Sequence, residues 1–212
     1  DGISGNVTLE FEDGHVEDGY NIFSNYTGNT DYELVIRPEA GATSVELTSS
    51  INGKILAFIG ARNVILDGRA GGTGASVLTV NNNSTSGGLA GISFEGQTNN
   101  VTVKYCNIIY RGFGIRTVGG GANDPENVVI ENCNFSTPEI NETLPNLWAL
   151  NHNCISTDIM TIRNNVFQSP NIGTGSVGTY LAMYIRSAAD IYNNMIAVGD
   201  IPADKIYGIR TN

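Results

Sequence analysis

A short pattern of alternating apolar and polar residues recurs along the chain, and it constrains the fold more than any other feature. Each copy has two alternating apolar positions, a polar corner and one further apolar residue. Full copies occupy Val101–Ile108, Val128–Phe135, Met160–Phe167 and Ala189–Ile196, and a partial copy occupies Val64–Asp67. Equivalent apolar residues fall 37, 27, 32 and 29 residues apart, at Leu66, Val103, Ile130, Ile162 and Ile191.

This spacing predicts a β-solenoid. Alternation with a period of two indicates short strands with one buried face. A strand unit that recurs about every 30 residues is typical of a solenoid, and the sequence lacks the long 3.6-residue periods of helical solenoids. Successive coils would stack as parallel strands about 4.8 Å apart. We therefore expect an all-β, right-handed parallel β-helix.

A second recurrent strand precedes the first one in each coil. Its copies place an isoleucine at a matched position, and we expect these residues to form one inward stack: Ile92, Ile115, Ile155, Ile185 and Ile209. A third strand follows the polar corner, as in Ile108–Tyr110. Three short strands per coil give a roughly triangular cross-section.

The same register predicts two further columns. Outward residues next to the inward column alternate in charge, at Asp67, Lys104, Glu131 and Arg163. Opposite charges on neighbouring strands stabilise the pair by about 0.2–1 kcal/mol. The corner column reads Cys106, Cys133, Asn165 and Asn194. Asparagine tolerates the left-handed backbone of a sharp corner, and its amide can bond to the coils above and below.

The cysteines in the corner column have two interpretations. Cys106 and Cys133 are either a disulfide or metal-ligand pair, or two small residues stacked in the interior. Parallel stacking rarely gives the geometry of a disulfide, which favours the second interpretation. Together with Cys154 they are too few for a disulfide framework, and their spacing fits no zinc motif.

The regular coils occupy residues 63–212, and the chain ends inside a strand pattern. Because an open solenoid end exposes unpaired backbone, we expect the solenoid to be a fragment of a longer chain that continues past residue 212. Residues 1–62 are less regular, although Val7–Phe11 and Leu34–Ile36 alternate like strands. We interpret them as the N-terminal cap and opening coil of the same solenoid.

Charge and hydropathy exclude two kinds of partner. The formal net charge is −10 and only 15% of residues are charged, whereas duplex binding needs clustered lysines and arginines. No apolar run reaches the roughly 18 residues of a membrane span. We therefore expect no nucleic-acid partner and no membrane-spanning segment.

The order of several segments resembles a known family. Gly5–Phe11 is followed by Leu34–Pro38, then by Asn63–Gly74 and Asn100–Ile108. This order is similar to that in the large repetitive surface proteins of gliding bacteria, which are exported by the type IX secretion pathway. The match covers most of the chain, and its most specific stretch is Asn63–Gly74.

The resemblance implies an extracellular, adhesin-like or structural module at the bacterial cell surface. It implies no catalytic residue and no cofactor. The implied partners are other domains of the same long chain, surface glycans, and secretion or outer-membrane proteins.

A polysaccharide-binding or polysaccharide-cleaving protein is the alternative, because parallel β-helices also include pectate lyases and polygalacturonases. Glycan hydrolysis needs two converging carboxylates, and a calcium-assisted lyase needs a carboxylate cluster and a base. The acids Asp67, Glu131 and Asp190 are each isolated by the expected register. We therefore expect a non-catalytic structural or adhesive module without a metal site.

Three arginines form a candidate ligand-binding stripe. Arg116, Arg186 and Arg210 each follow an expected inward isoleucine, so they should project outward, with Arg186 and Arg210 on adjacent coils. Two like charges on adjacent coils repel each other unless an anion or a carboxylate lies between them. The stripe would bind an acidic glycan or a partner protein. The alternative is solvated arginines paired with Asp200 or Asp204.

Acidic and histidine residues outside the repeats are weaker candidates. Asp13, Glu17 and Asp18 could ligate Ca²⁺, but their spacing matches no EF-hand loop, and a solvated turn is the alternative. His15 and His152 have no nucleophile context in the sequence. We expect neither of them to be catalytic.

The insertion Pro138–Asn153 holds the only tryptophan, Trp148. It could cover the side of the solenoid or form a docking surface, since an exposed tryptophan is often an interface anchor. Packing against its own coil is the favoured interpretation.

Overall fold

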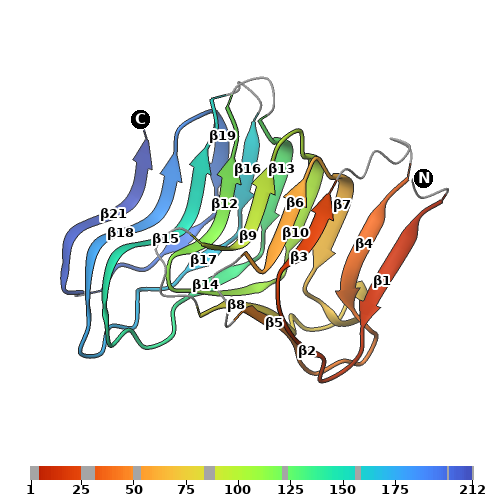
Figure 1. Cartoon of the computed structure of the whole chain (residues 1–212), viewed down its shortest axis with the longest axis horizontal. Helices are drawn as coiled ribbons and strands as arrows, with labels where there is room; N and C mark the ends of the chain where they lie inside the picture. Colours follow the sequence, from red (N-terminus) through yellow and green to blue (C-terminus); the bar gives the residue numbers. More distant parts are fainter. Residues whose placement is uncertain are drawn as a thin grey trace.

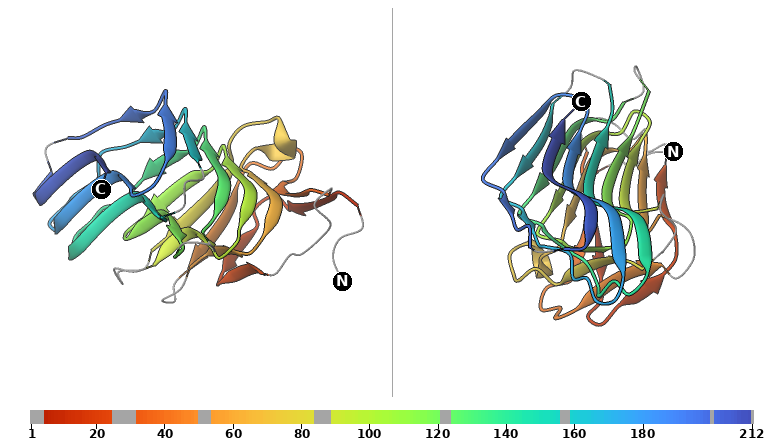
Figure 2. Two further views of the ribbon diagram at one scale, coloured as in Figure 1. Left: turned by 90° about the horizontal axis from the view of Figure 1, so that it is seen from above. Right: turned by 90° about the vertical axis from the view of Figure 1, so that its left-hand side faces the viewer.

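The computed structural model is a stack of coils (Figure 1) that describes residues 5–24, 32–49, 54–83, 89–120, 124–155, 159–199 and 201–211. The chain visits three parallel sheets in turn, and each sheet has seven strands. Figure 2 shows the sheets as faces of an elongated stack, with the first and last strands at opposite ends. The expected all-β parallel β-helix with three strands per coil is confirmed.

The three sheets are labelled A, B and C. Sheet A contains β1 (Val7–Phe11), β4 (Leu34–Pro38), β7 (Arg62–Asp67), β10 (Asn99–Lys104), β13 (Glu126–Glu131), β16 (Met160–Arg163) and β19 (Ala189–Tyr192). Sheet B contains β2 (Val16–Asp18), β5 (Val45–Ser49), β8 (Leu78–Asn82), β11 (Asn107–Tyr110), β14 (Asn134–Ser136), β17 (Val166–Phe167) and β20 (Met195–Ile196). Sheet C contains β3 (Asn21–Ser24), β6 (Leu56–Ile59), β9 (Ala90–Glu95), β12 (Phe113–Val118), β15 (Thr143–Asn153), β18 (Ser176–Ile185) and β21 (Ala203–Thr211).

The inner column of sheet A has the predicted register. Val103 pairs with Leu66 on one side and Ile130 on the other, and the column continues through Ile162 to Ile191. The first four of these side chains are fully buried, and Ile191 is partly buried against the same core. Burial of one such side chain stabilises the fold by about 1.5–3 kcal/mol. Each coil gains this burial only from its neighbours, which makes the stack cooperative.

The corner between sheets A and B carries the predicted asparagine ladder. The amide of Asn165 accepts a hydrogen bond from the backbone N–H of Cys133 at 2.9 Å and donates one to the carbonyl of Ile130 at 3.0 Å. One coil further on, Asn194 accepts from the backbone N–H of Asn165 at 3.0 Å and donates to the carbonyl of Ile162 at 2.9 Å. The ladder therefore joins successive coils through their corners.

The left-handed residue at this corner is the one before the ladder, and our expectation for the ladder residues was wrong. Positive φ values of 54–56° occur at Tyr105, Asn132, Asn164 and Asn193. A left-handed residue bends the chain sharply between sheet A and sheet B, and the following side chain turns toward the interior. This is why Asn165 is buried while Asn164 is exposed.

The predicted isoleucine stack of sheet C is correct only in part. Ile155 lies past the end of β15 and is 56% exposed, and Ile185 pairs with His152. The observed column is Ile92, Ile115, Leu150, Met183 and Ile209.

Strand length explains the error between β18 and β21, whereas Ile155 lies five residues past Leu150, which occupies the matched position. β15 and β18 are long and curved strands (Figure 1). The similar tetrapeptides Tyr184–Ser187 and Gly208–Thr211 suggested a match, but the observed pairing is offset from it by two residues. A shift of two residues keeps the same face inward, so the local pattern cannot distinguish the two registers.

The strand pairing crosses residues 62 and 63 without interruption, because β4, β5 and β6 pair with β7, β8 and β9. The first coils therefore belong to the same stack, while the cap boundary at residue 62 stays a prediction. In the described segments, no helix is long and apolar enough to cross a membrane.

Candidate functional site

The predicted outer charge column on sheet A is confirmed. Lys104 lies 3.4 Å from Asp67, and Arg163 lies 2.6 Å from Glu131. The structure extends this column by one further pair, since Arg37 contacts the carboxylate of Glu10 at 2.8 Å on the first two strands. These charges connect one coil to the next.

Asp67 is the most buried member of this column, with 3% of its surface exposed. Its Oδ1 accepts hydrogen bonds from the backbone N–H and Nε of Arg69, and its Oδ2 accepts one from the guanidinium at 2.8 Å. Burial raises the pKa of the Asp67 carboxyl, but the hydrogen bonds from Arg69 and the charge of Lys104 outweigh it and leave the pKa below its ordinary value. The Arg69 guanidinium also lies 4.0 Å from the centre of the Tyr105 ring. Asp67 is therefore a fixed carboxylate that holds a loop in place.

That loop is part of the stretch with the most specific family resemblance. It runs from β7 to β8 and contains the short 3₁₀ turn Ala70–Gly72. A Cβ atom on Gly68 would lie 2.0 Å from the carbonyl oxygen of Tyr105, so only glycine fits at that position. Close packing of this loop against the next coil therefore accounts for its glycine at position 68.

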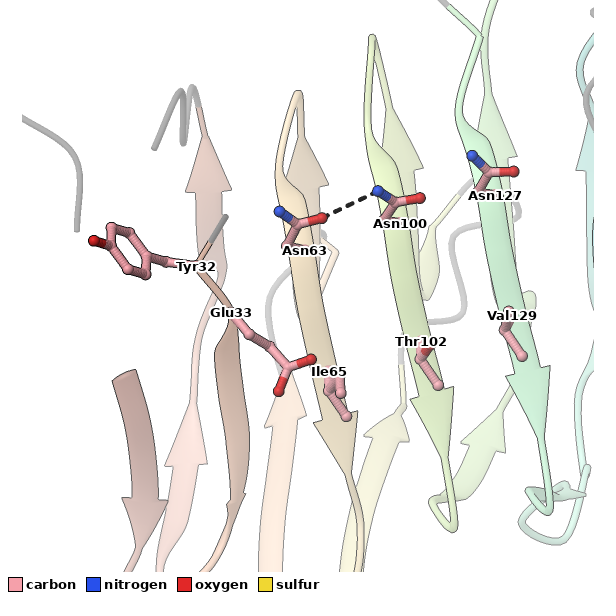
Figure 3. Close-up of a pocket in the computed structure, with 8 residues that line it drawn as sticks. All are labelled: Tyr32, Glu33, Asn63, Ile65, Asn100, Thr102, Asn127 and Val129. Carbon is pink, nitrogen blue, oxygen red and sulfur yellow. Dashed lines mark hydrogen bonds between the residues drawn. The ribbon is translucent and has the colours of Figure 1, made fainter. Parts of the chain in front are cut away.

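A shallow groove of about 500 Å³ runs along the outer face of sheet A (Figure 3). Asparagines with positive φ line one side, and the Asn100 amide donates to Asn63 Oδ1 at 3.1 Å. Figure 3 shows the Glu33 side chain directed toward Ile65 at one end of the groove. The full lining is Tyr32, Glu33, Asn63, Ile65, Asn100, Thr102, Asn127 and Val129. With one carboxylate among amides and apolar groups, this lining can bind a polar chain, but it lacks a pair of converging acids.

Two of the three predicted stripe arginines share a column of sheet C. Arg116 pairs with Asn151, which pairs with Tyr184, which pairs with Arg210. The two arginines are therefore three coils apart. Arg186 follows the end of β18, outside this column, and its guanidinium donates to Asn153 Oδ1 at 3.3 Å. The expectation that Arg186 stacks on Arg210 was wrong. The cause is the two-residue offset between β18 and β21 that also separates Ile185 from Ile209.

Aromatic rings accompany these arginines on the outer face of sheet C. The Trp148 ring lies 5.3 Å from Phe113, edge to face, and 5.4 Å from Tyr184. The Arg116 guanidinium lies 5.1 Å from the centre of the Phe113 ring, and the guanidinium of Arg210 lies 5.4 Å from the Tyr207 ring. None of these six side chains belongs to the hydrophobic core cluster: Phe113, Arg116, Trp148, Tyr184, Tyr207 and Arg210. We call them the aromatic–arginine face.

Most of the segment Pro138–Asn153 is a sheet strand. Residues Thr143–Asn153 are β15, and Leu144, Leu147 and Leu150 are buried in the core. Trp148 is partly exposed, and the rings that contact it, Phe113 and Tyr184, belong to the two neighbouring coils, whereas the favoured interpretation had it packing against its own coil. Sequence reasoning missed Phe113, Tyr184 and Tyr207 because their grouping depends on the register of β15 and β18.

His152 is buried in the column next to this face. Its Nδ1 lies 2.9 Å from the Thr117 hydroxyl, and its Nε2 lies 2.6 Å from the Ser187 hydroxyl. Burial lowers the pKa of the imidazole to about 4. His152 has no nucleophile context along the sequence, but in the fold two hydroxyl groups from other coils flank its ring. With so low a pKa, the imidazole is a weak base and serves here as a neutral hydrogen-bonding group.

The acidic turn at the first coil is occupied by internal contacts. Asp13 Oδ1 accepts hydrogen bonds from the backbone N–H and the hydroxyl of Thr43, at 2.6 and 3.0 Å, and these bonds lower the pKa of its carboxyl. Glu17 lies 3.4 Å from the ring of His15. Among the described residues, no group of three or more His, Cys, Asp or Glu side chains is placed to hold a metal ion.

All three cysteines are buried and free. The hydrogen bond between Cys106 and Cys133, together with burial, raises the pKa of the Cys106 thiol. Cys154 donates to the Thr117 hydroxyl at 3.3 Å, and burial raises the pKa of its thiol to about 11. The pair in the corner column is therefore two stacked thiols.

Comparisons with known proteins give no relative for this chain. No protein-family model matches it. No curated protein and no solved structure matches it either.

Proposed function

We propose that this chain is a non-catalytic structural and adhesive module of a secreted or surface-anchored bacterial protein. The observation that carries the proposal is how the outer charges of sheet A are used. The pairs Glu10–Arg37, Asp67–Lys104 and Glu131–Arg163 each connect neighbouring coils. Because these charged groups pair with each other between coils, they favour a structural scaffold over a catalytic site.

The shape of the scaffold supports an adhesive role. Seven strands in register give each face of the solenoid a long surface on which equivalent positions repeat at the spacing of the strands. Such a surface suits a partner that is itself a repeating polymer. The groove over sheet A and the aromatic–arginine face of sheet C are both of this kind.

The placement outside the cell depends on the resemblance at Asn63–Gly74. It suggests export by the type IX pathway and partners among other domains of the same long chain, surface glycans, and secretion or outer-membrane proteins. Antibodies raised against the purified chain would test this in the bacterium that encodes it. We expect them to label intact cells or the culture medium, and labelling only after lysis would contradict the placement.

Adhesion and catalysis can be separated in one experiment. Fluorescent beads coated with the purified chain are passed over surfaces carrying bacterial and plant polysaccharides, and the fluid is assayed for new reducing ends and unsaturated sugars. We expect bead retention on at least one polysaccharide without release of shortened sugars. Retention equal to that of albumin-coated beads would refute the adhesive role, and released oligosaccharides would favour the polysaccharide-cleaving alternative.

A further inference from the structure

The aromatic–arginine face combines the two kinds of group that recognise an acidic sugar chain. Its rings come from four consecutive strands of sheet C: Phe113 on β12, Trp148 on β15, Tyr184 on β18 and Tyr207 on β21. Phe113 is buried, and the other three rings are partly exposed. Partly exposed rings can stack on the apolar faces of sugar rings.

The aromatic–arginine face is poorer in acidic residues than the chain as a whole. The chain has 21 acidic and 11 basic residues, yet β12, β15 and β18 contain no acidic residue and β21 contains one, Asp204. On the neighbouring strand β9, Glu95 is in an ion pair with Lys54 and also interacts with the charge of Arg116. Arg116 and Arg210 stand at the two ends of the column, and within the described segments Arg210 makes no ion pair with an acid. Two guanidinium groups on a surface that is poor in acidic residues favour an anionic ligand.

Two polar atoms, one on Asn151 beside the face and one on Trp148 within it, make no hydrogen bond to the described residues. Asn151 lies in the column between Arg116 and Tyr184, is 4% exposed, and its Oδ1 makes no hydrogen bond. The indole Nε1 of Trp148 is also buried without a partner. Leaving a buried acceptor or donor unsatisfied costs about 1–3 kcal/mol. A ligand that shifts the Trp148 ring and supplies hydroxyl groups would remove that penalty.

We propose that the aromatic–arginine face binds a carboxylated polysaccharide. The sugar rings stack on Trp148, Tyr184 and Tyr207, and carboxylates meet Arg116 and Arg210. A guanidinium can hold a carboxylate through two parallel hydrogen bonds. Adjacent strands are about 4.8 Å apart, which is close to the length of one sugar unit in an extended chain, so successive coils can meet successive sugars. This inference rests on the proposed adhesive function and names the ligand class of that function.

Affinity electrophoresis and calorimetry with defined polymers test the inference. The probes are polygalacturonate and alginate as acidic polysaccharides, dextran and hydroxyethyl cellulose as neutral ones, and polyglutamate as an acidic polymer without sugar rings. All measurements contain EDTA, so that calcium does not bridge the polymer. We expect binding of at least one acidic polysaccharide, weakening as salt is raised, and at least tenfold weaker binding of the neutral polymers and of polyglutamate.

Matched variants locate the binding surface. We expect Arg210→Gln and Tyr207→Ala each to weaken binding by roughly fivefold, the effect of losing one charge or one ring contact. Arg62→Gln removes a cation from sheet A, on another face, and should leave binding unchanged. Circular dichroism confirms that each variant is folded. Because Tyr207 and Arg210 lie on the last strand, Arg116→Gln on β12 supplies an independent variant.

Three results would overturn the inference. They are equal binding of polyglutamate and acidic polysaccharide, loss of binding in Arg62→Gln as large as in Arg210→Gln, and no binding of either acidic polysaccharide. In the last case, coated beads that still adhere to another polysaccharide would leave the adhesive function standing. Failure of the beads on every surface would remove both proposals.

Discussion

At the scale of single residues, His152 makes the stability of the protein depend on pH. Burial places its folded-state pKa at about 4, below the ordinary value of 6.5. Between these values the unfolded chain binds more protons than the folded one, so the free energy of unfolding falls as pH falls. The decrease is at most about 1.4 kcal/mol per pH unit. Urea unfolding at pH 7, 5.5 and 4.5 measures it.

The substitution His152→Gln tests whether His152 causes this pH dependence of stability. The variant has no titrating group at this position, so we expect a smaller slope between pH 6.5 and 4 than in the natural protein. His15→Gln removes the other histidine of the chain and is the matched control with which the slope of His152→Gln is compared. An unchanged slope in His152→Gln would assign the effect to other groups.

Asp67 is the residue of the outer column whose loss should matter most. Asp67→Asn removes the carboxylate that pairs with Arg69 and Lys104. The Asp67 residue is only 3% exposed. Removing one partner of a buried ion pair costs about 3–5 kcal/mol. Glu10→Gln breaks the more exposed pair with Arg37 and should cost less than about 1 kcal/mol. Similar losses in the two variants, measured by urea unfolding, would show that burial does not distinguish them.

The outer charges were predictable because they depend only on the alternation within short strands. Once Val103 and Ile130 face inward, Lys104 and Glu131 must face outward. The partners of His152 were not predictable, because Thr117 and Ser187 come from other coils and from the register of the long strands.

At the scale of structural elements, the asparagine ladder fixes the corner between sheets A and B. Asn165→Leu removes the acceptor for Cys133 N–H and the donor to the Ile130 carbonyl, and both groups lie in the interior. We expect a loss of about 2–4 kcal/mol in the free energy of unfolding. The matched variant Asn194→Leu, one coil further on and more exposed, should lose less. A larger loss at Asn194 than at Asn165 would contradict this order.

Strand length decided which elements could be derived from the sequence. The strands of sheet A have four to six residues, and one inward pair together with its polar corner fixes the register. β15 has 11 residues and β18 has 10, and each places two consecutive side chains in the core, Ala149 with Leu150 and Ala182 with Met183. Alternation alone cannot align such strands. The aromatic–arginine face, which depends on that alignment, could therefore not be predicted.

At the scale of the whole molecule, the stack is a one-dimensional array in which each coil is stabilised by its neighbours. Ile130 lies in the middle of its column and is fully buried, whereas Ile191 lies on the last strand of sheet A and is only partly buried. Truncation of a buried isoleucine to alanine costs about 2–5 kcal/mol. We expect a loss in this range for Ile130→Ala and a clearly smaller loss for Ile191→Ala.

Hydrogen exchange shows whether this gradient is a property of the array. Local opening needs less free energy where fewer buried contacts must break, so backbone amides of β10 and β13 should exchange most slowly, and those of the end strands β1, β19 and β21 fastest. Ile130→Ala should lower protection on both sides of its coil, because β13 supports β10 and β16. Ile191→Ala should lower protection only at the last coil. Equal protection in all coils, with both variants acting globally, would mean that the solenoid unfolds as a single unit and that its coils are not energetically separable.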